Sequence, residues 1–372
     1  MDPRPTEQQV QLGRTLQRLI EREYTLEQRR QSLPEGGFSR RRWQLLCDIG
    51  LPALLVPESH GGLQAPLGDV LYAMQCLGPA MPPEPVLASC VLAPWLLARA
   101  GGDAAARWLP RLAEGAIGSV AMFEPGSGFD HARARCRARR DAGHWVLDGA
   151  KALVPQGEDA ELLLVWARDE HDAPAWFALP ADTPGIGLRG YALLDGQRAA
   201  ELSLHDVRVA QQARLPGDAA QLADELRDLW LAALCSDAVG VLQATLDATV
   251  EYLGTRQQFG QPLARLQALQ HRASAMWIDV EQARSMAWLA AARFESEPAP
   301  RRAALLAAAK SRVGRACRDV AQQAVQLHGG IGLSDELRVS HWFKRLSLLE
   351  LWLGDSRAQL QRYIDLSAAL PA

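Results

Sequence analysis

The sequence contains no asparagine among its 372 residues, and lysine accounts for only three of its 40 basic side chains. Because the N-glycosylation motif requires asparagine, the chain has no acceptor site for that modification. We interpret both shortages as a bias towards GC-rich codons and not as a sign of function. The three lysines are Lys151, Lys310 and Lys344.

Paired cysteines and clustered histidines are also lacking. The even number of cysteines permits disulfides, but a chain of this size without a signal peptide favours small buried thiols. None of the eight histidines stands at metal-ligand spacing from a cysteine or a carboxylate, so we expect no metal site. The six cysteines are Cys47, Cys76, Cys90, Cys136, Cys235 and Cys317.

The chain has neither a long apolar run nor a surplus of one charge. The stretch from Pro85 to Ala98 is too short for a membrane span and is interrupted by Ser89 and Pro94. The N-terminus has no apolar segment of the kind that signal peptides carry, so we expect a cytoplasmic protein without a membrane partner. Forty basic against 43 acidic side chains give a net charge of −3, which does not favour nucleic acid as a partner.

The common catalytic and nucleotide-binding motifs are absent: there is no GxGxxG, no P-loop, no HExxH and no GxSxG. Apolar residues recur at helical spacing from about residue 7 to 114 and again from about 218 to 369. Between them, short apolar runs separated by turn residues are typical of strands. Helices and strands do not alternate as in a βαβ fold, which excludes Rossmann and TIM architectures.

This order predicts three domains, in keeping with a length that suggests about 2.5 domains. We expect an N-terminal helical domain (1–118), a middle β domain (119–215) and a C-terminal helical bundle (216–372). The strands are expected at 120–123, 145–147, 162–166, 176–179 and 202–209.

Two blocks in the last zone resemble a known family. Residues 254–260 (GTRQQFG), followed by 267–271 (QALQH), are similar to the R-x-x-F-G … Q-x-x-Q block of acyl-CoA dehydrogenases. Residues 326–332 (QLHGGIG) resemble the Q-x-x-G-G-x-G block of the same family. Shorter similarities follow in the family's order over essentially the whole chain, at 56–62, 108–110, 124–128, 148–151 and 204–209.

The resemblance implies a mainly α fold with a central β domain: N-terminal helices, a β-barrel-like middle domain and a C-terminal four-helix bundle. It also implies FAD as cofactor, an acyl-CoA thioester as substrate and electron-transferring flavoprotein as acceptor. The reaction of the family removes a proton from the carbon α to the thioester while hydride leaves the β carbon for the flavin. It therefore needs a carboxylate base in a desolvated cleft that raises its pKa.

The family's cofactor contacts fall on residues whose chemistry suits a phosphate. Arginine offers a planar, permanently charged fork, and paired glycines let backbone amides approach closely. Simpler interpretations remain open: Gly329 and Gly330 as a helix cap, Arg256 as a solvated side chain and Phe259 as core. The residues that the resemblance assigns to the flavin are Arg256, Phe259, Gln267, Gln326, Gly329 and Gly330.

An alternating run of arginines offers a second phosphate candidate. In a strand, the run would lie on one face, as a solvated face or, alternatively, as a contact for the phosphates of coenzyme A. The run consists of Arg133, Arg135, Arg137 and Arg139.

The sequence departs from the family where the base is expected. The usual Y-E-G-T segment reads Trp352–Asp355 (WLGD), with Leu353 at the carboxylate position. The earlier position that some members use corresponds to Trp230. Asp355 and Asp228 are weak candidates for a displaced base, because an offset of two residues on a helix points to another face.

Residues that hold the flavin ring in the family are replaced as well. Phe123 stands where a hydroxyl precedes E-P, Phe129 replaces a serine, and residues 151–155 (KALVP) lack the family's tryptophan and hydroxyl. The family shares each flavin site across a dimer interface, and the blocks kept here are those that reach the partner's flavin.

A chain that keeps the contacts to its partner's flavin and lacks those to its own resembles the small subunit of heteromeric bacterial acyl-CoA dehydrogenases. We therefore expect a subunit that lacks its own base and completes the flavin site of a Glu-containing homologue in a hetero-oligomer. One alternative is a self-sufficient homodimer or homotetramer with a displaced carboxylate base. Another is a flavin monooxygenase or a binding protein on the same scaffold.

Overall fold

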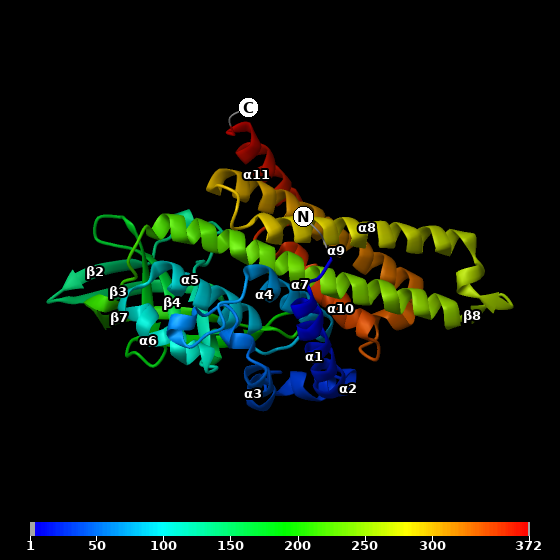
Figure 1. Ribbon diagram of the computed structural model, residues 1–372, viewed down its shortest axis with the longest axis horizontal. Coiled ribbons are helices and arrows are strands. Elements are labelled where there is room, and N and C mark those ends of the chain that lie inside the picture. Colours follow the sequence, from blue (N-terminus) through cyan, green and yellow to red (C-terminus); the bar gives the residue numbers. More distant parts are fainter. Residues whose placement is uncertain (1–3, 371–372) are drawn as a thin grey trace. The chain divides into compact units, whose positions relative to one another are not determined.

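The computed structural model describes residues 4–370 (Figure 1), and the chain folds into two compact units. One, unit 1, comprises Met1–Ser32, Leu71–Met81 and Trp230–Ala372. The other, unit 2, comprises Leu33–Val70 and Pro82–Leu229. The helices are α1 Glu7–Glu23, α2 Leu26–Ser32, α3 Arg40–Asp48, α4 Leu67–Leu77, α5 Ala93–Ala100, α6 Gly102–Ala113, α7 Ala219–Thr255, α8 Gln267–Arg293, α9 Ala299–His328, α10 Arg338–Leu351 and α11 Ser356–Ala368.

Unit 2 contains a seven-stranded sheet in the order β1-β4-β2-β3-β7-β6, with β5 paired to β4. Most neighbours are antiparallel, whereas β1 and β2 run parallel to β4. β4 is buried almost throughout because its apolar side chains are covered on both faces. The strands are β1 Gly118–Ala121, β2 Arg137–Asp141, β3 His144–Pro155, β4 Leu162–Arg168, β5 Pro174–Pro180, β6 Ile186–Ala192 and β7 Arg198–Ala210.

The five predicted strand regions overlap β1, β3, β4, β5 and β7, but they include neither β2 nor β6. In β2 (RARRD) the one apolar residue is Ala138, so the segment carries no apolar pattern. β6 pairs with β7 at the edge of the sheet, and none of its residues is fully buried. With two glycines, β6 has only Ile186 and Leu188 as alternating large aliphatic side chains, which is too short a pattern to predict a strand. Its identity follows from its ladder to β7, which runs from Ile186 to Ala192.

The arginine run does not form a single strand, so the expectation of four side chains on one strand face is wrong. Arg133 ends a short 3₁₀ turn and Arg135 precedes β2, which begins at Arg137. The four are exposed and each lies near a carboxylate, as in the Arg139–Asp206 pair at 2.9 Å. This arrangement is that of a solvated surface.

Unit 1 is built around α7 and α9, whose apolar residues form its core. α7 is long and apolar enough to cross a membrane, yet 89% of its most apolar window is buried inside the protein, as in the central helix of a bundle. α4 crosses α7 at Gly240, where an added Cβ would lie 1.9 Å from the carbonyl oxygen of Gln75. Only glycine permits this close approach of two helix backbones.

All six cysteines are free thiols, in agreement with the sequence prediction. Cys90, Cys136, Cys235 and Cys317 are buried, and Cys47 and Cys76 are partly buried. Burial raises the pKa of Cys235 to about 12, so this side chain stays a neutral thiol in the core of unit 1.

Candidate functional site

The first predicted cofactor-contacting block forms an exposed hairpin directly after α7. Residues 254–260 are all exposed, and β8 Gln257–Gln258 pairs with β9 Gln261–Pro262. Phe259 lies at the tip with 86% of its surface exposed and a left-handed φ of 54°. The interpretation of Phe259 as core is therefore wrong, because the ring projects into solvent.

Arg256 is the first residue of this hairpin, and its backbone forms two hydrogen bonds. Its N–H donates to the carbonyl of Tyr252 at 2.9 Å, and its own carbonyl accepts from Leu263 N–H at 2.9 Å. Among residues 4–370 no carboxylate pairs with its guanidinium, although most other arginines of the chain have such a partner. An exposed cation without an internal partner is free to bind an anion.

The second predicted block follows the end of α9 and is exposed at Gly329–Ile331. Gly329 has a φ of 67° and caps the helix, since its N–H donates to the carbonyls of Val325 and Gln326. The cap interpretation is thus confirmed for Gly329. Gly330 is different: its φ is not positive, and an added Cβ would meet nothing within 4 Å.

The chain's own packing therefore gives no reason for a glycine at position 330. Open space beside an unshielded backbone is what a ligand or a second chain needs in order to approach the amide groups. Gln326 and Gln267, the first residue of α8, are exposed as well. These features fit the pyrophosphate of FAD, with Arg256 as the charged group.

The two blocks are joined by an aromatic contact that sequence reasoning missed. Tyr252, in the last turn of α7, stacks on His328, the last residue of α9, with ring centroids 4.4 Å apart. Tyrosine four residues before Arg256 and histidine directly before Gly329 are the only signals of this contact in the sequence.

The two positions that the sequence comparison assigns to the family's base are apolar and buried in unit 1. Trp230 is 2% exposed and Leu353 is 5% exposed. The ring of Trp230 meets that of Trp352 edge-on at 5.9 Å, so the two positions lie in one packed cluster. Leu353 is held in a left-handed conformation with a φ of 58°.

The two candidate carboxylates have different surroundings. Asp355 is the N-cap of α11: its Oδ1 accepts the N–H groups of Arg357 at 3.1 Å and Ala358 at 2.8 Å. Asp228 lies within α7 and is 1% exposed. Their assignment as a displaced base stays a prediction.

In unit 2, the segment that the resemblance assigns to the flavin ring packs against neighbouring side chains of the same unit. Phe123 is 3% exposed and packs edge-on against Phe129, with ring centroids 5.3 Å apart. The next residue, Glu124, is buried and pairs with Lys151 at 2.8 Å. Burial alone would raise the pKa of Glu124, but the Lys151 charge and hydrogen bonds from Lys151 and two backbone N–H groups hold it below its usual value.

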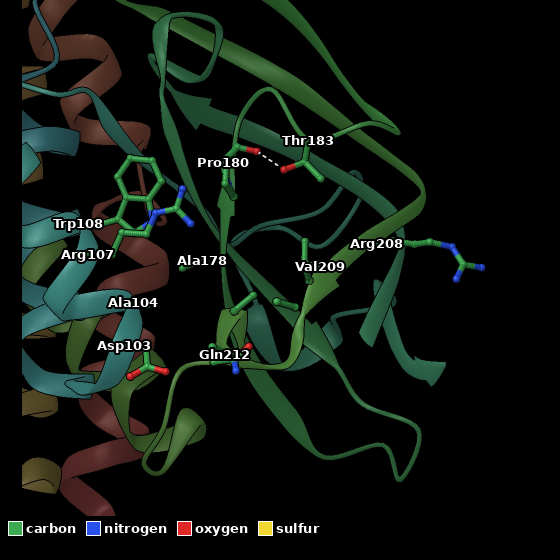
Figure 2. Close-up of a pocket in the computed structure, with 12 residues that line it drawn as sticks. Asp103, Ala104, Arg107, Trp108, Ala178, Pro180, Thr183, Arg208, Val209 and Gln212 are labelled. Atoms are coloured by element: carbon green, nitrogen blue, oxygen red, sulfur yellow. Dashed lines mark hydrogen bonds between the residues drawn. The ribbon is translucent and has the colours of Figure 1, made fainter. Parts of the chain in front are cut away.

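A hollow of unit 2 lies elsewhere (Figure 2), between α6 and the ends of β5 and β7. It is a cavity of about 430 Å³. The Thr183 hydroxyl donates to the Pro180 carbonyl at 2.6 Å beside it, while Arg208 points away from it (Figure 2). None of the residues predicted to contact the flavin, and neither candidate base, lines this cavity.

Three domain models of one family match most of the chain. Residues 6–116 match the acyl-CoA dehydrogenase N-terminal domain, residues 119–207 the middle domain and residues 232–364 the C-terminal domain. The bovine mitochondrial short-chain specific acyl-CoA dehydrogenase is 30% identical over 340 residues, which is 87% of this chain and 82% of that protein.

Two solved structures are similar over nearly the full length. One is the ChsE4-ChsE5 complex from Mycobacterium tuberculosis, with a TM-score of 0.91 and 28% identity over 100% of both chains. The other is a variant of the Tcur3481-Tcur3483 steroid acyl-CoA dehydrogenase, with a TM-score of 0.89 and 28% identity over 97% of this chain and 98% of that one. The predicted fold class is confirmed by these similarities and by the order of helices and strands.

Proposed function

The chain belongs to the acyl-CoA dehydrogenase family, a family of FAD-dependent oxidoreductases, and from that premise we propose that it is a subunit that lacks a catalytic base of its own. In this proposal it completes the flavin site of a homologous, Glu-containing partner. The assembly then carries out the α,β-dehydrogenation of an acyl-CoA thioester, with electron-transferring flavoprotein as acceptor.

The observation that carries the proposal is that apolar side chains, Trp230 and Leu353, stand at both positions where a base is expected. A base must be a carboxylate that reaches the α carbon, and neither tryptophan nor leucine can take up a proton there. Trp230 and Leu353 are buried beside Trp352, so these side chains pack as core. The turn after α10 therefore has a structural role in this chain.

The exposed hairpin and the exposed glycines support the second half of the proposal. The Arg256 side chain has no carboxylate partner among residues 4–370, Phe259 is 86% exposed, and an added Cβ at Gly330 would meet nothing within 4 Å. When bound, FAD supplies hydride-accepting chemistry to the assembly. Arg256 would hold a phosphate oxygen, and the backbone at Gly329 and Gly330 would approach the pyrophosphate.

The solved relatives support a two-chain assembly as a proposal for this protein. One of them is described as a complex of two differently named chains, and the other carries two names and is described as a steroid enzyme. A bulky acyl-CoA, such as a steroid side chain thioester, is therefore a reasonable first substrate to test beside fatty acyl-CoA thioesters.

The decisive experiment measures flavin per polypeptide. The isolated chain should purify nearly colourless, since two copies of this chain would form two incomplete sites. When it is co-expressed with a Glu-containing homologue encoded beside it, a heterotetramer should bind about two FAD and not four, one for each mixed pair.

A yellow homomer with one FAD per subunit would contradict the half-site proposal. It would favour the alternative of a self-sufficient homomer with a displaced base. Flavin that binds only in its reduced, free form and reacts with oxygen would favour a monooxygenase.

A further inference from the structure

The stacked pair of Tyr252 and His328 links the two exposed segments of unit 1. Besides the stacking at 4.4 Å with the ring planes 24° apart, the Tyr252 hydroxyl reaches the carbonyl oxygen of His328 at 3.4 Å. The contact spans 76 residues of sequence and joins the ends of α7 and α9. An aromatic pair with this geometry stabilises the arrangement of both helix ends.

Each member of the pair is tied directly to one segment. The Tyr252 carbonyl accepts the N–H of Arg256, so the end of α7 sets where the hairpin begins. His328 immediately precedes Gly329, whose N–H is bonded back into the last turn of α9. The end of α7 therefore sets where the hairpin begins, and the end of α9 sets where the glycine segment begins.

The imidazole of His328 is itself held in one orientation. Its Nδ1 lies 2.9 Å from the carbonyl oxygen of Ala324, and only a protonated Nδ1 can donate to that acceptor. The ring is 6% exposed, and burial lowers the pKa of His328. The ring therefore presents a fixed, neutral face to Tyr252.

We propose that Tyr252 and His328 form a clamp that fixes the separation between Arg256 and the Gly329–Gly330 backbone. The proposal rests on the proposed function, in which these groups hold the pyrophosphate of FAD. A diphosphate offers its oxygens at set spacings, so donors that are already positioned bind it without the entropic cost of ordering two loops. Tyr252 and His328 are positioning residues in this scheme, because they act through Arg256 and the glycines.

The first test uses the isolated chain and needs neither FAD nor a partner. Hydrogen–deuterium exchange is measured on peptides that cover 252–262 and 325–334. Tyr252→Leu removes the stack and should speed exchange in both peptides together, whereas Tyr252→Phe keeps the stack and should leave both close to wild type. Tyr363→Leu, at a partly exposed tyrosine on α11, is the matched control. A change confined to the peptide with the substitution would overturn the clamp.

The second test is a double-mutant cycle on the FAD-binding assembly, with the dissociation constant of FAD as readout. Tyr252→Leu should weaken FAD binding about 10-fold with Arg256 present, and less than about 2-fold in the Arg256→Ala background. A merely structural role of Tyr252 would give the same factor in both backgrounds and would overturn the positioning role.

The controls separate this inference from the proposed function. If Arg256→Ala weakens FAD binding and Tyr252→Leu does not, the clamp is wrong and the proposed function stands. If Arg256→Ala itself leaves FAD binding unchanged, both the cofactor role of Arg256 and the assignment of the clamp to FAD are wrong.

Discussion

The Nζ of Lys310 lies 2.8 Å from the carbonyl oxygen of Glu350, at the end of α10. The same Nζ reaches the carbonyl oxygen of Gly354 at 3.2 Å, so one buried lysine spans the turn that holds Leu353. The turn is further fixed by the Glu350 carboxylate, which accepts from the N–H of Ser356 at 3.1 Å and from its hydroxyl at 2.9 Å. Burial lowers the pKa of Lys310, which is 1% exposed.

We expect Lys310→Met to lower the free energy of unfolding by about 2–4 kcal/mol, because it removes the donor of the buried Glu350 carbonyl and of the partly buried Gly354 carbonyl. Denaturant titration followed by circular dichroism measures this effect. Lys344→Met, at a lysine paired with exposed Asp335, should cost less than about 1 kcal/mol. Equal effects of the two substitutions would show that Lys310 does not hold the turn.

Arg256→Ala should lower flavin retention far more than it lowers stability. The side chain is exposed, so the unfolding free energy of the isolated chain should change by no more than about 0.5 kcal/mol. A lost charge-assisted bond to phosphate of about 1.5–3 kcal/mol corresponds to a roughly 10- to 100-fold weaker affinity for FAD in the assembly. Arg256→Lys should recover part of the affinity, since lysine lacks the planar fork.

The isolated chain should not dehydrogenate any acyl-CoA, because a general base typically contributes about 10²–10⁴-fold to the rate. Activity is assayed with an artificial electron acceptor, added FAD and a panel of acyl-CoA thioesters. Robust turnover would mean that a displaced carboxylate serves as base. Asp355→Asn and Asp228→Asn would then identify it, with Asp365→Asn on exposed α11 as a control.

Acidification from pH 7 to pH 5 should lower the free energy of unfolding. Burial lowers the pKa of both His328 and His341 below the ordinary value of 6.5. Between the folded and unfolded pKa values, these two side chains therefore bind more protons in the unfolded chain than in the folded chain. Stability rises with pH wherever the unfolded state binds more protons, so it is lost as the pH decreases. The loss begins near pH 6.5 and levels off below the folded pKa values.

The His328→Gln, His341→Gln double variant should show a flatter pH dependence over the same range. His171→Gln, at an exposed histidine on the β4–β5 turn, should keep the wild-type slope. An unchanged slope in the double variant would show that other groups cause the acid sensitivity.

The sequence predicted the order of helices and strands because the apolar periods of 3.6 and 2 differ clearly between the three zones. It did not predict β2, which holds one apolar residue, or β6, whose apolar alternation is limited to Ile186 and Leu188. The residues predicted to contact the cofactor come from local motifs, and they are exposed at Arg256, Phe259 and Gly329. The Tyr252–His328 stack was missed because a contact over 76 residues leaves no local pattern.

The proposed loss of the base rests on a change of residue type at two positions, which the sequence shows directly. The packing at these positions could not be predicted, because the edge-on contact of Trp230 with Trp352 and the hydrogen bonds of Lys310 to the turn are tertiary contacts. The domain boundaries and the identity of a displaced base stay predictions.

The exposed Phe259 at the hairpin tip affects how the isolated chain interacts with other proteins in the cell. In the two-chain assembly that we propose, a copy without its partner would present Phe259, which is 86% exposed, to other chains, and an exposed aromatic ring promotes nonspecific association. Balanced synthesis of both chains would keep such orphan copies scarce. The amount of the partner chain, and not the folding of this chain, would then determine how much of this chain escapes degradation in the cell.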